Sequence, residues 1–142
     1  MTQNLENIII SMPNAPFNET EDGAAKLETA RQNSLSRNVP LLILFGANWC
    51  PDARLMSATL SHTDIHALLG LNFEIVQIDV GRYDRNQSLH AALGFDVLEG
   101  LPTIIVLSPG NEILNKNNVF AWRDARNIPT IDFVQSMLSL VS

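Results

Sequence analysis

The chain has 142 residues, of which 46% are hydrophobic and 17% charged, and its formal net charge is −6. This length predicts one domain, residues 1–142, with its own core, and the composition excludes a disordered chain. An acidic balance without a basic cluster argues against nucleic-acid binding. The single cysteine, Cys50, excludes an internal disulfide and a cysteine-built metal site.

Helices and strands alternate along the first half of the chain. Residues 1–19 predict an irregular arm, and Thr20 is expected to cap a helix that ends near Arg37. Its expected inward side chains are Leu27, Ala30, Ser34 and Leu35. Residues 41–45 are apolar at every position, which predicts a strand buried on both faces. Pro51 suits the first turn of a following helix, and residues 64–69 predict a second, shorter one.

The second half continues the alternation. Residues 73–80 predict a second central strand, and residues 86–93 predict a helix that ends at a glycine. Residues 101–107 predict a third strand with a proline near its start, followed by a hairpin that residues 112–114 complete. Thr130 is expected to cap a last helix whose apolar face is formed by Ile131, Val134, Leu138 and Val141, with Phe133 and Met137 beside it.

No targeting or membrane segment is visible. The longest apolar stretch, residues 41–47, is far shorter than the about 20 residues that span a bilayer. We expect no membrane insertion and a cytoplasmic location, with the periplasm as the alternative if a signal peptide has been removed.

Cys50 is the candidate functional residue. It follows a strand and a short loop and precedes Pro51, so it is expected at a helix N-terminus, where backbone N–H groups and the helix dipole stabilise a thiolate. The carboxylate of Asp52 opposes this effect if it lies close. A buried, inert cysteine is the alternative interpretation.

Two segments give the sequence a resemblance to a known family. Residues 45–54 (FGANWCPDAR) resemble the active-site segment of the thioredoxin superfamily, and Leu101-Pro102-Thr103 resembles its cis-proline loop. The resemblance covers roughly residues 20–141 by element order. It implies a thioredoxin-like α/β fold, in which helices flank a mixed central sheet and a helical extension precedes it. The Trp-Cys-Pro-Asp form is most similar to bacterial thioredoxin-like disulfide reductases or isomerases.

The resemblance also implies roles for the matching residues. Cys50 is the expected nucleophile, Pro51 shapes the helix start, and Trp49 and Asp52 tune access and charge. Pro102 is expected in cis, which places the Leu101 backbone beside Cys50 for pairing with an extended substrate.

Three positions depart from the family pattern. The second cysteine falls at Ala53, which is either native or an engineered replacement. The buried aspartate and its partner lysine fall at Leu44 and Gln77. Cys50 can therefore form a mixed disulfide, but no thiol of this chain can resolve it.

These observations favour a thiol–disulfide oxidoreductase or isomerase with one active-site cysteine. Its expected partners are protein or glutathione thiols and disulfides, together with an external reductant or resolving thiol. The alternative is a redox-inert thioredoxin-like module for protein binding or chaperoning. A third possibility is that the natural protein has a cysteine at position 53 and performs a dithiol cycle. We expect a monomer without a cofactor.

Other candidate residues carry weaker signals. His62 and His66 have the spacing of a metal-ligating pair but no third ligand, so we expect solvated side chains and no metal site. His90 is expected at the surface, and Trp122 is expected to be half-buried before the last helix. Asp79 and Asp84 have the positions of strand-end and turn carboxylates.

Overall fold

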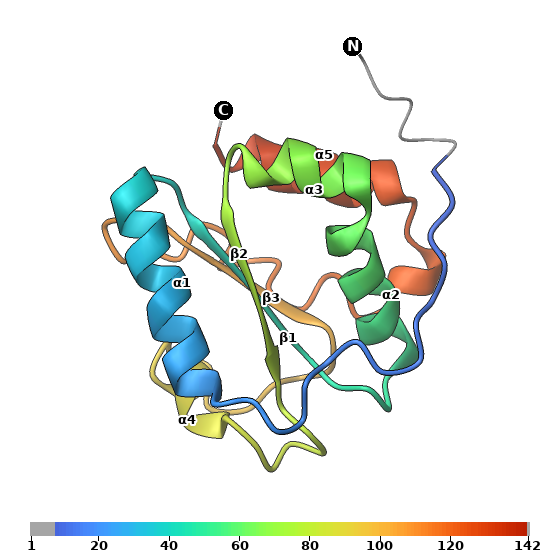
Figure 1. The fold of residues 1–142 in the computed structure, drawn as a ribbon, viewed down its shortest axis with the longest axis horizontal. Coiled ribbons are helices and arrows are strands. Elements are labelled where there is room, and N and C mark those ends of the chain that lie inside the picture. Colours follow the sequence, from blue (N-terminus) through green and yellow to red (C-terminus); the bar gives the residue numbers. More distant parts are fainter. Residues whose placement is uncertain (1–7, 142) are drawn as a thin grey trace.

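A three-stranded sheet forms the centre of the fold in the computed structural model, which describes residues 8–141 (Figure 1). Its strands are β1 (Leu41–Gly46), β2 (Glu74–Asp79) and β3 (Thr103–Leu107), in the order β2-β1-β3. β2 is parallel to β1 and β3 is antiparallel to it, so the predicted mixed sheet is confirmed. The expectation that β2 is a second central strand is wrong, because in the described part of the chain it pairs only with β1.

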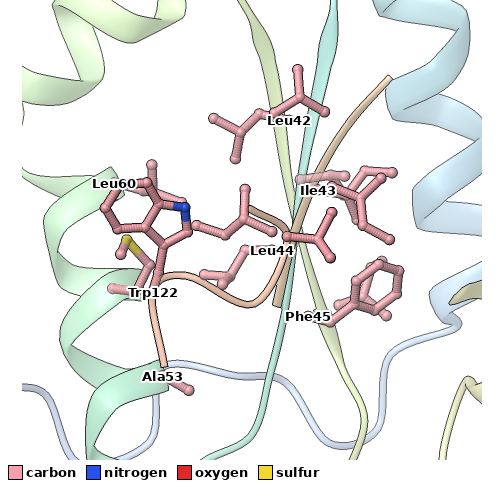
Figure 2. Close-up of a cluster of buried hydrophobic side chains, with 14 of the residues drawn as sticks. Leu42, Ile43, Leu44, Phe45, Ala53, Leu60 and Trp122 are labelled. Atoms are coloured by element: carbon pink, nitrogen blue, oxygen red, sulfur yellow. The ribbon is translucent and has the colours of Figure 1, made fainter. Parts of the chain in front are cut away.

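β1 is the central strand because both of its faces are covered. All of its residues are buried, as its uninterrupted apolar sequence predicts. Figure 2 shows Ile43 and Phe45 on one side of the sheet and Leu44 on the other, where Trp122 lies. Because side chains alternate along a strand, Gly46 shares the face of Leu44. A short loop after Gly46, the last residue of β1, leads to Cys50.

Helices flank the sheet on both sides (Figure 1). On one side lie α1 (Gly23–Arg37) and the short α4 (Gln87–Ala91), and on the other lie α2 (Pro51–Ser61), α3 (Thr63–Gly70) and α5 (Thr130–Ser139). A short 3₁₀-helix, η2 (Ala125–Asn127), precedes α5. A helix before the first strand and a mixed sheet between helices confirm the predicted fold class.

α1 begins later than predicted. Asp22, not Thr20, is its N-cap residue, and the Asp22 carboxylate accepts a hydrogen bond from the N–H of Ala25 at 3.1 Å. An acidic cap also stabilises the positive end of the helix dipole. The predicted end of the helix is confirmed, but Leu35 is 44% exposed, so its predicted inward orientation is wrong. Leu35 lies about 100° around the helix from the buried Ser34, outside the buried stripe.

The region around β3 contains less regular structure than predicted. The strand begins at Thr103 rather than at Leu101, since Pro102 has no N–H to give to a sheet. The predicted hairpin after β3 is reduced to one antiparallel bridge between Leu107 and Ile113.

The last two helices also differ from the predictions at their ends. α4 is shorter than the predicted 86–93. Pro129 is the N-cap residue of α5, and Thr130 is its first helical residue. Val141 lies beyond the end of the helix and is 37% exposed, so its predicted place on the buried face is wrong. The buried side chains of α5 are Phe133, Val134 and Met137.

The N-terminal arm has no helix or strand over residues 8–19 and passes along the side of the molecule that carries α2 (Figure 1). The other residues of the predicted arm, 1–7, lie outside the described residues. Phe17 is the anchor of the arm, because it is only 4% exposed and belongs to the hydrophobic core. Within residues 8–141, no helix has the length and apolar character needed to cross a membrane.

Candidate active site

Cys50 lies between β1 and α2 and is the N-cap residue of that helix. Its backbone is extended, and Pro51 occupies the first helical position. The unpaired N–H groups of the first turn and the helix dipole favour negative charge at this end of α2. The only thiol of the chain is therefore at the N-terminal end of a helix.

The cis-proline segment lies against this thiol. The Leu101–Pro102 peptide bond is cis, and the thiol of Cys50 donates a weak hydrogen bond to the carbonyl oxygen of Leu101, with 3.6 Å between sulfur and oxygen. Leu101 and Pro102 are buried, and Cys50 is 8% exposed. The fold thus brings together two segments that the sequence separates by about 50 residues.

Asp52 binds Arg126, which fixes η2 against the first turn of α2. One carboxylate oxygen of Asp52 accepts hydrogen bonds from the backbone N–H of Arg126 at 2.9 Å and from its Nε at 3.1 Å. The side chain of Asp52 is 13% exposed, whereas that of Arg126 is 53% exposed. The Arg126 guanidinium is thus the partner of the acidic residue in the first turn of α2.

Ala53 is completely buried on the inner face of α2 (Figure 2). A methyl group therefore stands where a second thiol is expected from the resemblance. Leu44 and Gln77 are neighbours across β1 and β2. Leu44 is fully buried, and the Gln77 side-chain oxygen accepts a hydrogen bond from the Ser57 hydroxyl at 2.5 Å. An apolar side chain and a neutral amide thus replace the acid and the base that could assist a second thiol.

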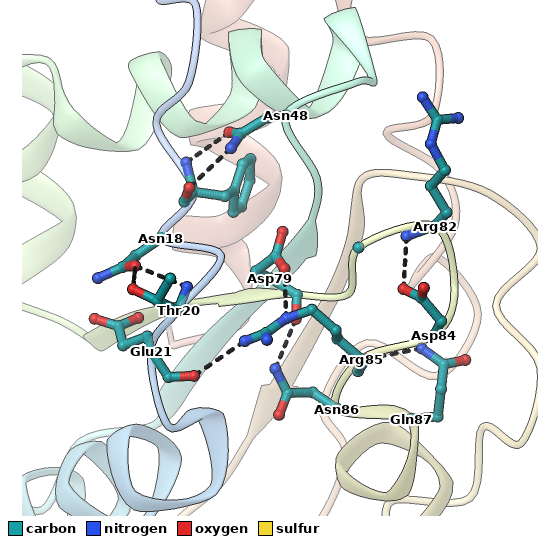
Figure 3. Close-up of polar contacts among 12 residues, drawn as sticks. Asn18, Thr20, Glu21, Asn48, Asp79, Arg82, Asp84, Arg85, Asn86 and Gln87 are labelled. Carbon is teal, nitrogen blue, oxygen red and sulfur yellow. Dashed lines mark hydrogen bonds and ion pairs between the residues drawn. The ribbon is translucent and has the colours of Figure 1, made fainter.

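The ring of Phe17 covers the end of β1 beside Ala53. A Cβ atom added to Gly46 would lie 2.4 Å from a ring carbon of Phe17 and 3.1 Å from the Cβ of Ala53, so these groups meet at one point. Asn48 holds the arm in place by two hydrogen bonds to the Phe17 backbone, shown in Figure 3. Its oxygen accepts from the N–H and its amide donates to the carbonyl, both at 2.8 Å.

The loop that follows β2 lies beside the Cys50 loop, because β1 and β2 are parallel and end at the same edge of the sheet. Trp49 connects the two loops: its Nε1 donates to the carbonyl oxygen of Gly81 at 2.6 Å. The ring of Tyr83 packs edge-on against Trp49 with 5.8 Å between centroids, and the Arg82 guanidinium lies 5.8 Å from the centre of the Trp49 ring. Trp49 and Tyr83 remain 39% and 40% exposed, so they form an accessible aromatic surface beside the thiol.

Asp79 anchors the base of this loop (Figure 3). Its Oδ2 accepts a hydrogen bond from the Nε of Arg85 at 2.9 Å, and its carbonyl oxygen accepts one from the side chain of Asn86 at 2.7 Å. Arg85 also donates to the carbonyl oxygen of Glu21 at 3.0 Å, which ties the loop to the segment before α1. Asp79 has the predicted strand-end position, but it is only 4% exposed, and its Oδ1 has no hydrogen-bond partner among the described residues.

Tyr83 gives a direct test of how close the two loops lie. Its backbone is left-handed, with φ of 63°, which is rare for a bulky residue. Burial, and after it the negative charge of the Cys50 thiolate, raise the pKa of Tyr83 above 10.0. We expect Cys50→Ser to bring the pKa of Tyr83 closer to 10.0 without restoring it fully, since burial remains. Phenolate absorbance against pH measures this cleanly, because Tyr83 is the only tyrosine.

The same shift has a consequence for stability. A folded-state pKa above the unfolded value means that folding favours the neutral phenol of Tyr83. This stabilisation is fully present below about pH 10 and is lost as the pH rises through the folded-state pKa.

The titration experiment with Cys50→Ser also has an outcome that contradicts it. Identical titration curves of Tyr83 in the wild type and in Cys50→Ser would contradict an electrostatic contact between the two residues.

The two histidines with metal-ligand spacing do not form a site. Nδ1 of His62 accepts a hydrogen bond from the N–H of Asp64 at 3.2 Å and caps α3, whereas His66 is exposed. Residues 8–141 contain no cluster of three His, Cys, Asp or Glu side chains that could hold a metal ion.

The expected surface position of His90 is wrong. The short α4 packs on the sheet and directs this side chain inward, where it is completely buried edge-on against Phe45. Its Nδ1 lies 2.5 Å from the carbonyl oxygen of Phe95. Trp122 is also more buried than predicted: it is 6% exposed and packs edge-on against Phe133.

Three residues of the site region were missed from the sequence, namely Phe17, Arg82 and Tyr83. Arg82 and Tyr83 could be assigned to the site only once the direction of β2 was known, because the loop after a strand parallel to β1 lies at the edge of the sheet where Cys50 is expected. Phe17 carried no such signal, since an irregular arm has no periodicity that assigns a side chain to the core.

The fold agrees with what comparison with known proteins finds. Residues 22–109 match a family of thioredoxin-like proteins, and the chain belongs to this family. The predicted relation to the thioredoxin superfamily and the thioredoxin-like fold are therefore confirmed. No curated protein sequence matches the chain.

Two solved structures illustrate the similarity. A disulphide isomerase from Xylella fastidiosa Temecula1 has a TM-score of 0.82 and 28% identity, over 91% of this chain and 98% of that one. The reduced C-terminal domain of DsbD from Neisseria meningitidis has a TM-score of 0.58 and 22% identity, over 82% of this chain and 95% of that one. At that identity, the DsbD domain shows the shared fold alone.

Proposed function

We propose that this protein is a thiol–disulfide oxidoreductase that acts on disulfides through Cys50 alone. The observation that carries the proposal is the position of the Cys50 sulfur, at the N-terminus of α2 and 3.6 Å from the carbonyl oxygen of Leu101, which precedes a cis proline. The similarity to the Xylella disulphide isomerase, at 28% identity over almost the whole chain, supports the same class of activity.

The reaction begins with one thiol–disulfide exchange. The Cys50 thiolate attacks one sulfur of a substrate disulfide, forms a mixed disulfide and releases the other sulfur as a thiolate. In the reductive route, an external thiolate attacks the Cys50 sulfur and releases the substrate as a thiolate; a second external thiolate then releases Cys50, and the two external thiols end as one disulfide. In the isomerising route, a second thiolate of the substrate attacks the substrate sulfur of the mixed disulfide and releases Cys50, so the disulfides of the substrate are rearranged without net oxidation or reduction.

A groove lined in part by the segment that precedes Leu101 in the chain is the candidate binding surface for a polypeptide substrate. It is open, has a volume of about 760 Å³, and is lined by the segments 94–99 and 116–123. Its aromatic side chains Phe95 and Phe120 pack edge-on, and Val97 is 78% exposed. We assign this groove to an extended segment of a substrate protein, whose backbone continues past Leu101 toward Cys50.

A redox-inert binding module is the second candidate. The low exposure of Cys50, 8%, and the fully buried methyl group of Ala53 favour it, because a shielded sulfur with no resolving partner is a poor catalyst. Such a module would use the same groove but would not exchange disulfides.

Mixed-disulfide formation separates the two candidates. We expect folded wild-type protein, incubated with glutathione disulfide, to gain the mass of one glutathionyl group, and Cys50→Ser to gain none. The melting temperatures of both proteins show whether the serine variant is folded, and wild type in urea shows that the thiol can be modified. If Cys50 reacts in urea but stays unmodified in the folded protein, the oxidoreductase proposal is rejected in favour of the binding module.

A further inference from the structure

Arg82 differs from the other arginines of the chain. Within residues 8–141, its guanidinium makes no hydrogen bond and no ion pair with the protein; only its backbone N–H is bound, by the Asp84 carboxylate at 3.0 Å. Figure 3 shows its side chain extending away from the polar network of the loop. The guanidinium groups of all other arginines bind protein atoms; these residues are Arg31, Arg37, Arg54, Arg85, Arg123 and Arg126.

The unpaired guanidinium nevertheless contacts the residue that precedes the thiol in the chain. It lies 5.8 Å from the centre of the Trp49 ring, and Trp49 is the residue before Cys50. Trp49 is itself fixed by its hydrogen bond to Gly81, the residue before Arg82. A cation–π contact holds the charge over the ring and leaves N–H groups at the edge of the guanidinium free to bind an anion.

The acids around the site do not neutralise Arg82. Asp52 is paired with Arg126, and Asp79 is paired with Arg85. Asp84, in the same turn, accepts the backbone N–H of Arg82 rather than its guanidinium. On a chain with a formal net charge of −6, Arg82 is thus an unneutralised positive charge against Trp49, the residue before the only thiol.

We propose that Arg82, supported by Trp49, binds a carboxylate of a low-molecular-mass thiol or disulfide, of which glutathione is the representative chemistry. The proposal rests on the proposed function and supplies the reactant that it lacks, because the mixed disulfide at Cys50 must be resolved by a thiol from outside this chain. A guanidinium matches the geometry of a carboxylate through two parallel N–H donors. It also offsets the repulsion that an acidic protein exerts on an anionic thiol.

The test compares three disulfides of different charge: glutathione disulfide, neutral 2-hydroxyethyl disulfide and cationic cystamine. The rate of mixed-disulfide formation at Cys50 is measured for each by mass spectrometry. We expect Arg82→Gln to lower the ratio of the glutathione disulfide rate to the 2-hydroxyethyl disulfide rate by about tenfold, the size of a lost charge-assisted hydrogen bond. The ratio for cystamine should rise.

Arg37→Gln is the matched control. Arg37 is the last residue of α1 and lies just before the start of β1, whereas Cys50 follows the end of that strand. The substitution therefore removes the same charge at the far end of β1 from Cys50. Six residues of strand span about 20 Å, twice the Debye length of about 10 Å at 0.1 M salt. We expect the rate ratios of this variant to equal those of the wild type. For the wild type, added salt should slow the glutathione disulfide reaction, whereas the net charge alone would make salt accelerate it.

Each outcome decides a separate question. Unchanged rate ratios in Arg82→Gln, or an equal loss with all three disulfides, reject the carboxylate site while the oxidoreductase stands. A wild type that reacts with no disulfide, the neutral one included, rejects the proposed function and this inference with it.

Discussion

Replacing Ala53 with cysteine is expected to convert the site into a dithiol pair that reduces insulin disulfides at least about tenfold faster than the present chain, with dithiothreitol as the reductant. Cys50 is the N-cap residue of α2 and position 53 lies one turn further along the helix. In a helix, Cα atoms three residues apart are separated by about 5 Å, which lies within the Cα separation of about 4.4–6.8 Å in disulfides. An intramolecular thiol resolves a mixed disulfide faster than an external one because it is held in place.

The surroundings of position 53 limit the gain. Ala53 is fully buried beside Phe17, so the larger side chain is expected to cost about 1–3 kcal/mol of stability in the reduced protein. Leu44 and Gln77 provide no acid–base pair to deprotonate the new thiol, so resolution should be slowed rather than prevented. If position 53 carries a cysteine in the natural protein, this variant restores its dithiol cycle.

Ala58→Cys is the matched control for a second thiol in α2. Position 58 is eight residues beyond Cys50, about 12 Å along the helix axis at 1.5 Å per residue, so no disulfide with Cys50 can form. We expect its insulin activity to equal that of the wild type. Equal activity in Ala53→Cys and in the wild type would show that resolution does not depend on position 53.

Replacing Phe17 with alanine is expected to lower the free energy of unfolding by about 3–5 kcal/mol, the usual cost of removing a buried aromatic ring. Phe17 is 4% exposed and packs on the end of β1 although it belongs to an irregular arm. Urea unfolding of both proteins measures the difference. Ile9→Ala, in the same arm but at a residue that is 85% exposed, should change the stability by less than about 0.5 kcal/mol.

Gly46→Ala shows whether the ring acts through this contact. Alone, the added methyl group would lie 2.4 Å from a ring carbon of Phe17 and should destabilise the protein. In the Phe17→Ala background the same methyl group enters vacated space, so the double variant should be more stable than the sum of the single effects. Strict additivity of the two substitutions would contradict the contact.

The sequence was most informative where one local rule determined the outcome. The uninterrupted apolar residues 41–45 predicted β1 because only a strand covered on both faces needs such a sequence. The junction at Cys50 was equally readable, since a proline after a strand marks a helix start. Cys50 and Leu101 could be brought together only through the family resemblance, because no local pattern connects residues so far apart.

The wrong predictions concern residues whose positions depend on tertiary contacts, which no local sequence pattern determines. His90 was expected at the surface because a polar residue in a short helix is usually solvated, but α4 packs directly on the sheet and buries it against Phe45. Thr20 and Asp22 are both good N-cap residues, so propensity could not decide between them. Arg82 and Tyr83 belong to a loop whose neighbour is known only once the direction of β2 relative to β1 is known.

Asn48 links the N-terminal arm to the loop that carries Cys50. Its side chain binds both backbone groups of Phe17, in the way that a neighbouring strand would, and it stands two residues before Cys50. We expect a displacement of this loop by a bound substrate to weaken these two hydrogen bonds to the arm. One of these hydrogen bonds shields the Phe17 amide proton from solvent. We therefore expect the exchange rate of this proton to increase when a substrate bound at Cys50 displaces the loop, and this rate can be measured without a label near the reacting atoms.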